Sequence, residues 1–278
     1  MRLGYHTNGL AHHDPLEALE LLAEIGYRSV AITIDHHCLS PRNPNLDQQL
    51  EQVRATLERL NLRSVIETGA RFLLDRNVKH EPTLMTADPL ARQRRIDFYR
   101  HAIHIAAALK SDCVSLWSGV LRDDANEAQA MSRLAEALLP VLDAAAAKDV
   151  TIGFEPEPGM FVDTMVRYDE LVNRINAEHL QLTLDIGHLH CLGETPLEHF
   201  IRRYVSTLVN VHIEDMRGGV HEHLPFGEGE IDFPPVLRAL REGGFQGGLH
   251  VELSRQSHDG PRFASDSYRF LSELMAAD

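Results

Sequence analysis

The stretch QLTLDI (Gln181 to Ile186) is a short run rich in apolar and β-branched residues that carries a carboxylate near its end. Runs of this length and composition are typical of strands buried in a parallel sheet. Seven further runs of the same kind recur along the chain: RLGYHT (Arg2 to Thr7), SVAITI (Ser29 to Ile34), RSVIET (Arg63 to Thr68), CVSLWS (Cys113 to Ser118), TIGFEP (Thr151 to Pro156), LVNVHI (Leu208 to Ile213) and GLHVEL (Gly248 to Leu253).

Amphipathic stretches separate these runs. In DPLEALELLAEIG (Asp14 to Gly26) the leucines fall on one helical face and the final glycine suits a C-cap. The segments 125–149 and 232–244 have the same pattern. Eight strand-helix units predict an α/β fold, a single-domain (β/α)8 or TIM barrel over residues 1–278, with an open doubly wound sheet as the alternative. The longest irregular stretch, 69–93, is then expected over the C-terminal mouth, where such loops often act as lids.

The charge balance disfavours a nucleic-acid partner. The 278 residues include 27 Lys and Arg against 41 Asp and Glu, a formal net charge of −14. Such a chain repels phosphate backbones. The one basic cluster, RQRR (Arg92 to Arg95), is interpreted as a solvated helix face.

The cysteines and the hydropathy pattern favour a cytoplasmic protein. Three scattered cysteines are too few for a disulfide framework, and the chain begins MRLGYHTNG without an apolar leader. No apolar run approaches the roughly 20 residues that span a bilayer. We therefore expect neither a transmembrane segment nor a membrane partner.

Four consecutive predicted strands end in side chains that can bind a metal: Glu155, Asp185, His212 and Glu252. The C-terminal ends of barrel strands meet at the active-site mouth. Three carboxylates and one imidazole suit one divalent cation, with Mn²⁺ favoured and Mg²⁺, Co²⁺ or Zn²⁺ also compatible. Without a cation these acids would repel one another in a medium of low dielectric constant.

The same strand ends, TIGFEPEPG, TLDIGHLH, VHIEDMRGG and GLHVELS, resemble those of the xylose isomerase-like TIM-barrel superfamily. That superfamily includes sugar-phosphate isomerases, ketose 3-epimerases, inosose-processing enzymes and endonuclease IV. The resemblance covers essentially the whole chain and is strongest from residue 151 onward. It implies that the four residues form the single-metal site of the epimerases, that His188 and Arg217 bind substrate, and that a homodimer is possible.

The leading functional hypothesis is an isomerase or epimerase of a keto-sugar or related polyol. A metal chelated by a ketose carbonyl and its neighbouring hydroxyl stabilises the enediolate formed when an adjacent proton leaves. Glu155 and Glu252 are predicted to act as catalytic base and acid. An unphosphorylated substrate is favoured, because the sequence shows neither a glycine-rich phosphate loop nor a basic pair at the mouth.

Two histidines in HEHLPFGEGEID precede a GEG turn. In endonuclease IV-like members an acidic residue and a histidine at these positions join the histidine after strand six in binding an additional zinc. Here the matching residues are His221, His223 and His188, so a histidine replaces the acid. A second metal, sugar contact and a purely structural loop remain open, and we assign His221 and His223 to substrate binding.

Further residues are expected at the mouth if the strand assignments hold: His6, Glu67 and Trp117, at the ends of strands one, three and four. A tryptophan there can form an apolar wall against a sugar face. Strands three and four end without a histidine, which breaks the trinuclear zinc pattern of endonuclease IV. A dehydratase of a cyclic keto-polyol such as an inosose, a zinc hydrolase and a catalytically silent barrel remain the alternatives.

Overall fold

A computed structural model describes residues 1–277, and in it eight parallel strands close into a barrel in the order β1-β10-β7-β6-β5-β4-β3-β2. The pairing of β1 with both β2 and β10 closes the sheet, which confirms the predicted barrel and rules out the open sheet. The barrel strands are β1 (Arg2–His6), β2 (Ser29–Thr33), β3 (Arg63–Glu67), β4 (Val114–Leu116), β5 (Ile152–Phe154), β6 (Leu180–Asp185), β7 (Leu208–Ile213) and β10 (Gly248–Val251).

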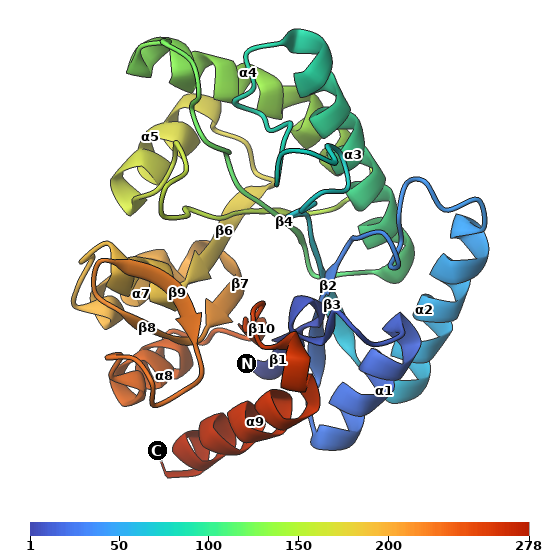
Figure 1. Ribbon diagram of the computed structural model, residues 1–278. Helices are drawn as coiled ribbons and strands as arrows, with labels where there is room; N and C mark the ends of the chain where they lie inside the picture. The colour runs from blue at the N-terminus through green and yellow to red at the C-terminus, as the bar shows by residue number, and fades with distance from the viewer. Residues whose placement is uncertain (278) are drawn as a thin grey trace.

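Helices form a ring around these strands (Figure 1). Within the described residues no helix is both long enough and apolar enough to cross a membrane. Short 3₁₀ turns lie at Thr7–Leu10 (η1), Val205–Thr207 (η2) and Ser257–Asp259 (η3). The α-helices are α1 (Pro15–Ile25), α2 (Leu46–Leu60), α3 (Pro89–Leu109), α4 (Glu127–Ala146), α5 (Met165–Ile175), α6 (Ile186–Cys191), α7 (Leu197–Tyr204), α8 (Phe233–Glu242) and α9 (Gly260–Ala277).

Helix α1 illustrates how local signals set the elements. The Asp14 carboxylate accepts hydrogen bonds from the backbone N–H groups of Leu16 and Glu17, and Gly26 ends the helix at φ 125°. Its buried face includes Leu19 and Leu22, each at most 2% exposed. Burying such a leucine stabilises the fold by about 1.5–3 kcal/mol. The helix predicted from the sequence is confirmed.

The barrel interior has a polar centre at His250. Its ring lies where a Cβ on Gly4 or Gly248 would approach it to 2.2 and 2.1 Å, so only glycine leaves room at these two positions. The His250 Nδ1–H donates to Asn210 Oδ1 at 2.7 Å, and Nε2 accepts from the Ser29 hydroxyl at 2.8 Å. Burial lowers the pKa of His250 well below its usual value, so the ring is neutral.

Between β7 and α8 the chain forms an antiparallel hairpin that the sequence analysis did not anticipate. Its strands are β8 (Asp215–Arg217) and β9 (Val220–Leu224). Gly219 between them has φ 73°, a conformation that favours glycine. The hairpin carries His221 and His223 two residues apart on one strand, so both side chains point to the same side.

The interpretation of the basic cluster as a solvated helix face is wrong for Arg95, which is 0% exposed. Its guanidinium donates to the backbone carbonyls of Pro82 (2.6 Å), Thr68 (3.0 Å) and His80. It also lies 5.1 Å from the centre of the Trp117 ring. Arg95 therefore fixes the irregular segment 68–88 to α3 and to the barrel mouth.

Candidate active site

Four metal-ligating side chains converge at the C-terminal mouth. Glu155 and Glu252 directly follow β5 and β10, Asp185 ends β6, and His212 lies one residue before the end of β7. The Nδ1 atom of His212 lies 3.0 Å from Glu155 Oε1, 3.3 Å from Glu252 Oε2 and 3.9 Å from Asp185 Oδ2. One ligand atom from each residue falls within 4.8 Å of all the others, which is the spacing of a coordination shell.

Asp185 shows how the local fold presents a ligand. Its Oδ1 accepts a hydrogen bond from the backbone N–H of His188 at 2.9 Å and so caps α6. Its Oδ2 is buried and has no hydrogen-bond partner. A buried carboxylate oxygen without a partner costs free energy, and a cation at this point would remove that cost.

The electrostatics of the four residues also fit a cation. Burial raises the pKa of Glu155 to about 8, against the opposing effect of His212. Although burial also acts on Glu252, the neighbouring histidines, His6 first, hold its pKa well below the usual range. Burial lowers the pKa of His212, but Glu155 and Glu67 outweigh it and hold that pKa well above the ordinary value. In the absence of a metal, protonation of a carboxylate and the neighbouring imidazoles offset the repulsion between the clustered carboxylates. A divalent cation would offset that repulsion more strongly.

The second nitrogen of His212 points to the barrel interior. Its Nε2–H donates to Glu67 Oε1 at 3.1 Å, and the Asn210 amide donates to the same carboxylate oxygen at 3.2 Å. A carboxylate on one imidazole nitrogen orients the other nitrogen toward a metal. Glu67, predicted as a substrate contact, thus lies against His212 as well as at the cavity wall.

A cavity of about 380 Å³, a volume typical of small-molecule sites, is lined by Glu155, His212 and Glu252 of this group. Trp117 forms part of its wall and packs edge-on against His80, with ring centres 5.5 Å apart. His6 also lines the cavity; both of its ring nitrogens are buried and without hydrogen-bond partners. Glu157, two residues after Glu155, faces the same cavity.

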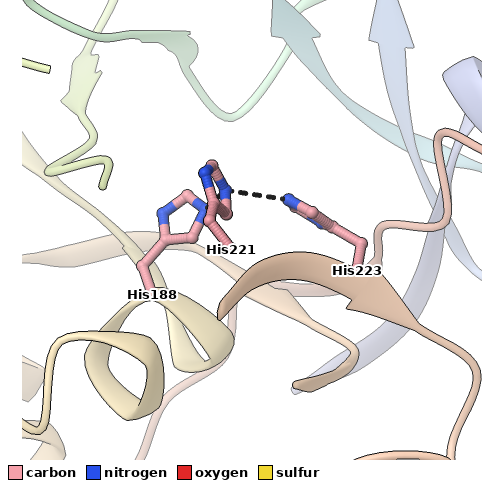
Figure 2. A group of neighbouring side chains, drawn as sticks. All are labelled: His188, His221 and His223. Carbon is pink, nitrogen blue, oxygen red and sulfur yellow. Dashed lines mark hydrogen bonds between the residues drawn. The ribbon is translucent and has the colours of Figure 1, made fainter. Parts of the chain in front are cut away.

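Three histidines form a second cluster beside the first (Figure 2). His188 extends from α6, and His221 and His223 from β9, toward one another. The Nε2 atom of His221 lies 3.1 Å from that of His188 and 3.3 Å from that of His223. All three line the cavity, as the sequence analysis expected.

The other nitrogens of this cluster define the tautomers. His188 Nδ1 is 3.2 Å from the Pro156 carbonyl, and His223 Nδ1 is 3.2 Å from the Glu252 carbonyl. Because a carbonyl only accepts, both Nδ1 atoms carry a proton, and in a neutral ring Nε2 then presents a lone pair. Burial lowers the pKa of His188 to about 4, so the ring does not gain a second proton at neutral pH. The lone pairs therefore converge on His221.

The carboxylate of Asp215 fixes the β8–β9 hairpin to the loop that follows it. Asp215 Oδ1 accepts from the backbone N–H groups of Met216 and Ile231, and its Oδ2 accepts from Gly227 at 2.9 Å. A Cβ on Gly229 would lie 2.2 Å from Asp215 Oδ1, which explains the glycine in the GEG turn. These hydrogen bonds position β9, and with it His221 and His223.

Arg217 is the one predicted substrate-binding residue that the structure does not bring to the cavity. It is exposed, and its guanidinium donates to the Glu228 carbonyl at 2.9 Å, on the far side of the hairpin. Sequence spacing did not reveal this, because residues on successive positions of a strand face opposite ways. Arg217 therefore does not line the candidate active site.

The sequence analysis missed three polar residues near the site. Asn8 donates to Glu252 Oε1 at 2.9 Å, and Thr33 ends β2 at the cavity wall. Glu214, two residues after His212, is fully buried with both carboxylate oxygens unpartnered; burial first, and then Asp185, raise its pKa well above the usual value. The only available signal was their position at or just beyond strand ends.

The barrel and its mouth define the class of protein. A model of the family described as xylose isomerase-like TIM barrel matches residues 19–274. The chain belongs to this family.

Its relatives are sugar epimerases. The L-ribulose-5-phosphate 3-epimerase UlaE of Escherichia coli (strain SMS-3-5 / SECEC) is 24% identical over 248 residues, which cover 88% of this chain and 84% of the relative. The enzyme of the same name from Salmonella heidelberg (strain SL476) is 25% identical over the same length and shares. These likenesses support an enzyme of the sugar isomerase or epimerase type.

Solved structures share the fold. A D-tagatose 3-epimerase-like protein superposes with a TM-score of 0.83 at 22% identity, covering 100% of this chain and 98% of its own. The 3-keto-D-glucoside 4-epimerase YcjR from E. coli superposes with a TM-score of 0.80 at 16% identity, covering 98% and 99%. At these identities the likeness shows the fold alone.

Proposed function

We propose that this protein is a divalent-metal-dependent epimerase or isomerase of a keto-sugar or related polyol. The observation that carries the proposal is the convergence of Glu155, Asp185, His212 and Glu252 within 4.8 Å, with Glu155, His212 and Glu252 lining the 380 Å³ cavity and Asp185 buried behind them. Three carboxylates with one imidazole favour Mn²⁺, and Mg²⁺, Co²⁺ or Zn²⁺ also suit the set. A bound cation would polarise a substrate carbonyl and stabilise negative charge on adjacent oxygens.

The chain's own carboxylates move the proton. Glu155 and Glu252 come from strands on either side of β6 and β7, and both lie within 3.3 Å of His212 Nδ1. One takes the proton from the carbon next to the carbonyl, and the other returns a proton to the opposite face or the neighbouring carbon.

The rest of the mouth binds and shields the substrate. Trp117 offers a flat apolar surface for the C–H face of a sugar, and His6 presents unpartnered nitrogens to its oxygens. Segment 68–88, held by Arg95, supplies Arg71, Lys79 and His80 to the rim. We therefore propose substrate contacts for His6 and Trp117, with Glu67 acting through His212.

The test is turnover in deuterated water. Mn²⁺-loaded protein is offered D-allulose, D-tagatose, L-ribulose and L-ribulose 5-phosphate, and deuterium incorporation and product configuration are read by NMR. Epimerisation with uptake of one solvent deuteron supports the proposal. A product lighter by one water molecule would instead identify the dehydratase alternative. No exchange with any of these ketoses, in protein that holds its metal, would contradict the proposal.

A second candidate role concerns His188, His221 and His223. Tetrahedral Zn²⁺ with bonds of about 2.0 Å to nitrogen holds its ligands about 3.3 Å apart. The separations of 3.1 and 3.3 Å between the Nε2 atoms match that spacing. Carbonyl-held Nδ1–H groups are also the usual outer contacts of metal-binding histidines. These observations favour a second cation over simple sugar contact, and metal stoichiometry distinguishes the two roles.

A further inference from the structure

Two buried polar atoms on the β1–β2 side of the cavity have no hydrogen-bond partner. They are the hydroxyl Oγ1 of Thr33, whose residue is 9% exposed, and the amide Oδ1 of Asn8. Leaving such an atom unsatisfied costs on the order of 1–3 kcal/mol. Both residues line the same cavity as Glu252 and His212, so a ligand in that cavity can satisfy them.

The local fold places these two side chains next to each other along the rim. The backbone N–H of Thr33 donates to the hydroxyl of Thr7 at 3.0 Å, which fastens the end of β2 to η1. Asn8 is the next residue of η1, and its carbonyl accepts from Ser257 at 2.9 Å. These bonds fix the backbone on which both side chains are carried.

The orientation of the Asn8 amide follows from its neighbour. Its Nδ2 donates to Glu252 Oε1 at 2.9 Å, so Oδ1 is the atom left without a partner. An amide oxygen accepts hydrogen bonds and cannot donate. A ligand atom that satisfies it must carry a hydrogen.

We propose that Asn8 and Thr33 are substrate-recognition residues that bind hydroxyl groups of the sugar on the β1–β2 side of the mouth. A hydroxyl donates to Asn8 Oδ1, and the Thr33 hydroxyl donates to or accepts from a second one. A hydroxyl, unlike a phosphate dianion, carries the hydrogen that Asn8 Oδ1 requires. The inference rests on the proposed function and names the substrate class for this side of the site.

Asn8 also links recognition to chemistry. The amide that binds the sugar hydroxyl at Oδ1 holds, through Nδ2, the Glu252 carboxylate that we propose as acid or base. Removal of the amide therefore affects kcat as well as KM. Thr33 has no hydrogen bond to a proposed acid or base among the described residues, so its hydroxyl affects KM alone.

The chain offers a matched control for Thr33. Thr183 also carries a buried hydroxyl without a partner and is 0% exposed, but it packs inside the barrel against Gly153 and does not line the cavity. Thr33→Val and Thr183→Val therefore make the same chemical change, loss of an unpartnered hydroxyl. Neither breaks a side-chain hydrogen bond, so both variants are expected to fold.

The experiment measures binding of D-allulose and of xylitol to Mn²⁺-loaded protein by calorimetry, and kcat and KM for any ketose turned over. Xylitol has hydroxyls but no carbonyl, so its binding reports recognition without the reaction. We expect Thr33→Val to weaken both ligands about 5- to 10-fold, the effect of one hydrogen bond. Thr183→Val should bind like the wild type, and Asn8→Ala should also lower kcat about 10-fold.

The outcomes separate the two proposals. Equal binding by Thr33→Val and Thr183→Val, or no binding of either ligand to the wild type, would overturn the recognition site. Xylitol binding that depends on Thr33, in a protein that epimerises no ketose, would support the recognition site and contradict the proposed function. A ketose phosphate that is turned over with a KM unchanged in both Thr33→Val and Asn8→Ala would show that these residues do not recognise the substrate, which also overturns the inference.

Discussion

The two sides of the barrel mouth differ in kind. The side formed by β5, β6, β7 and β10 carries Glu155, Asp185, His212 and Glu252, a concentration of charge that one cation would organise. The side formed by β1, β2 and β4 carries uncharged side chains at its strand ends, among them Thr33 and Trp117, although Arg71 and Lys79 of segment 68–88 also line the same cavity. We refer to them as the charged side and the neutral side.

The difference reflects what each side has to do. Converging carboxylates in a buried site are costly and are tolerated where their charge is used. Neutral hydroxyl, amide and ring groups bind a polyol at low desolvation cost, because the bonds they lose to water are replaced by bonds to sugar. We propose that reaction and recognition are divided between the two sides of one barrel.

The largest expected effect comes from breaking the charged side. Asp185→Ala removes a ligand oxygen that has no other partner, and His212→Ala removes the nitrogen at the centre of the set. Each variant should lose bound metal and retain less than about a thousandth of the turnover. Plasma mass spectrometry and the NMR assay measure both quantities, with Thr183→Val as the control. Full metal content in both variants would show that the four residues do not form the metal site.

The next effect separates chemistry from metal binding within the charged side. Glu155→Gln and Glu252→Gln keep a ligand oxygen but lose the group that carries a proton. Proton exchange should fall about 10²- to 10⁴-fold, while metal content falls less than in Asp185→Ala. Deuterium wash-in at matched metal occupancy is the measurement. Near-normal exchange in both variants would remove the acid and base assignment.

The three histidines test whether the charged side extends beyond four ligands. Zinc-loaded wild type is expected to hold two equivalents per chain, and the double variant His221→Ala, His223→Ala one. Loss of the second equivalent with the first retained supports the second cation. A single equivalent in both proteins would return His221 and His223 to the role of substrate contacts.

The smallest effect on turnover is expected from replacing Arg95, which holds the segment 68–88 next to the neutral side. Arg95→Met leaves the carbonyls of Pro82, Thr68 and His80 without their donor. The free energy of unfolding should fall by about 3 kcal/mol, measured by urea titration, with kcat changed only a few-fold. Arg100→Met is the control, because Arg100 lies on the same helix in an exposed pair with Asp97. Equal stability of the two variants would show that Arg95 does not fix the segment 68–88.

Much of the charged side could be predicted without a structure. Parallel strands in a barrel bring their C-terminal ends together, so ligand-type residues in phase at four strand ends must meet. That argument needs only the strand pattern, and it located Glu155, Asp185, His212 and Glu252. It also placed His6, Glu67 and Trp117 at the mouth.

Positions outside the barrel strands could not be derived in this way. The direction of Arg217 depends on the β8–β9 hairpin, and the burial of Arg95 depends on three carbonyls of a distant loop. The charge of Arg95 suggested solvent, yet carbonyl partners satisfied its donors and permitted burial. Asn8 and Thr33 carry no distinctive motif, and only the unpartnered state of their atoms reveals them.

The sequence by itself determined the eight strand-helix units and the identity of the four convergent side chains that could bind a metal, because strand periodicity and barrel closure leave little freedom at strand ends. Only the tertiary structure decided which groups bind the second ring nitrogen of each histidine and that Arg95 is buried. It also decided that polar atoms of Asn8 and Thr33 on the neutral side are left without hydrogen-bond partners. Those features depend on contacts between residues far apart in the chain, where a side chain's role is set by the partners that folding brings to it.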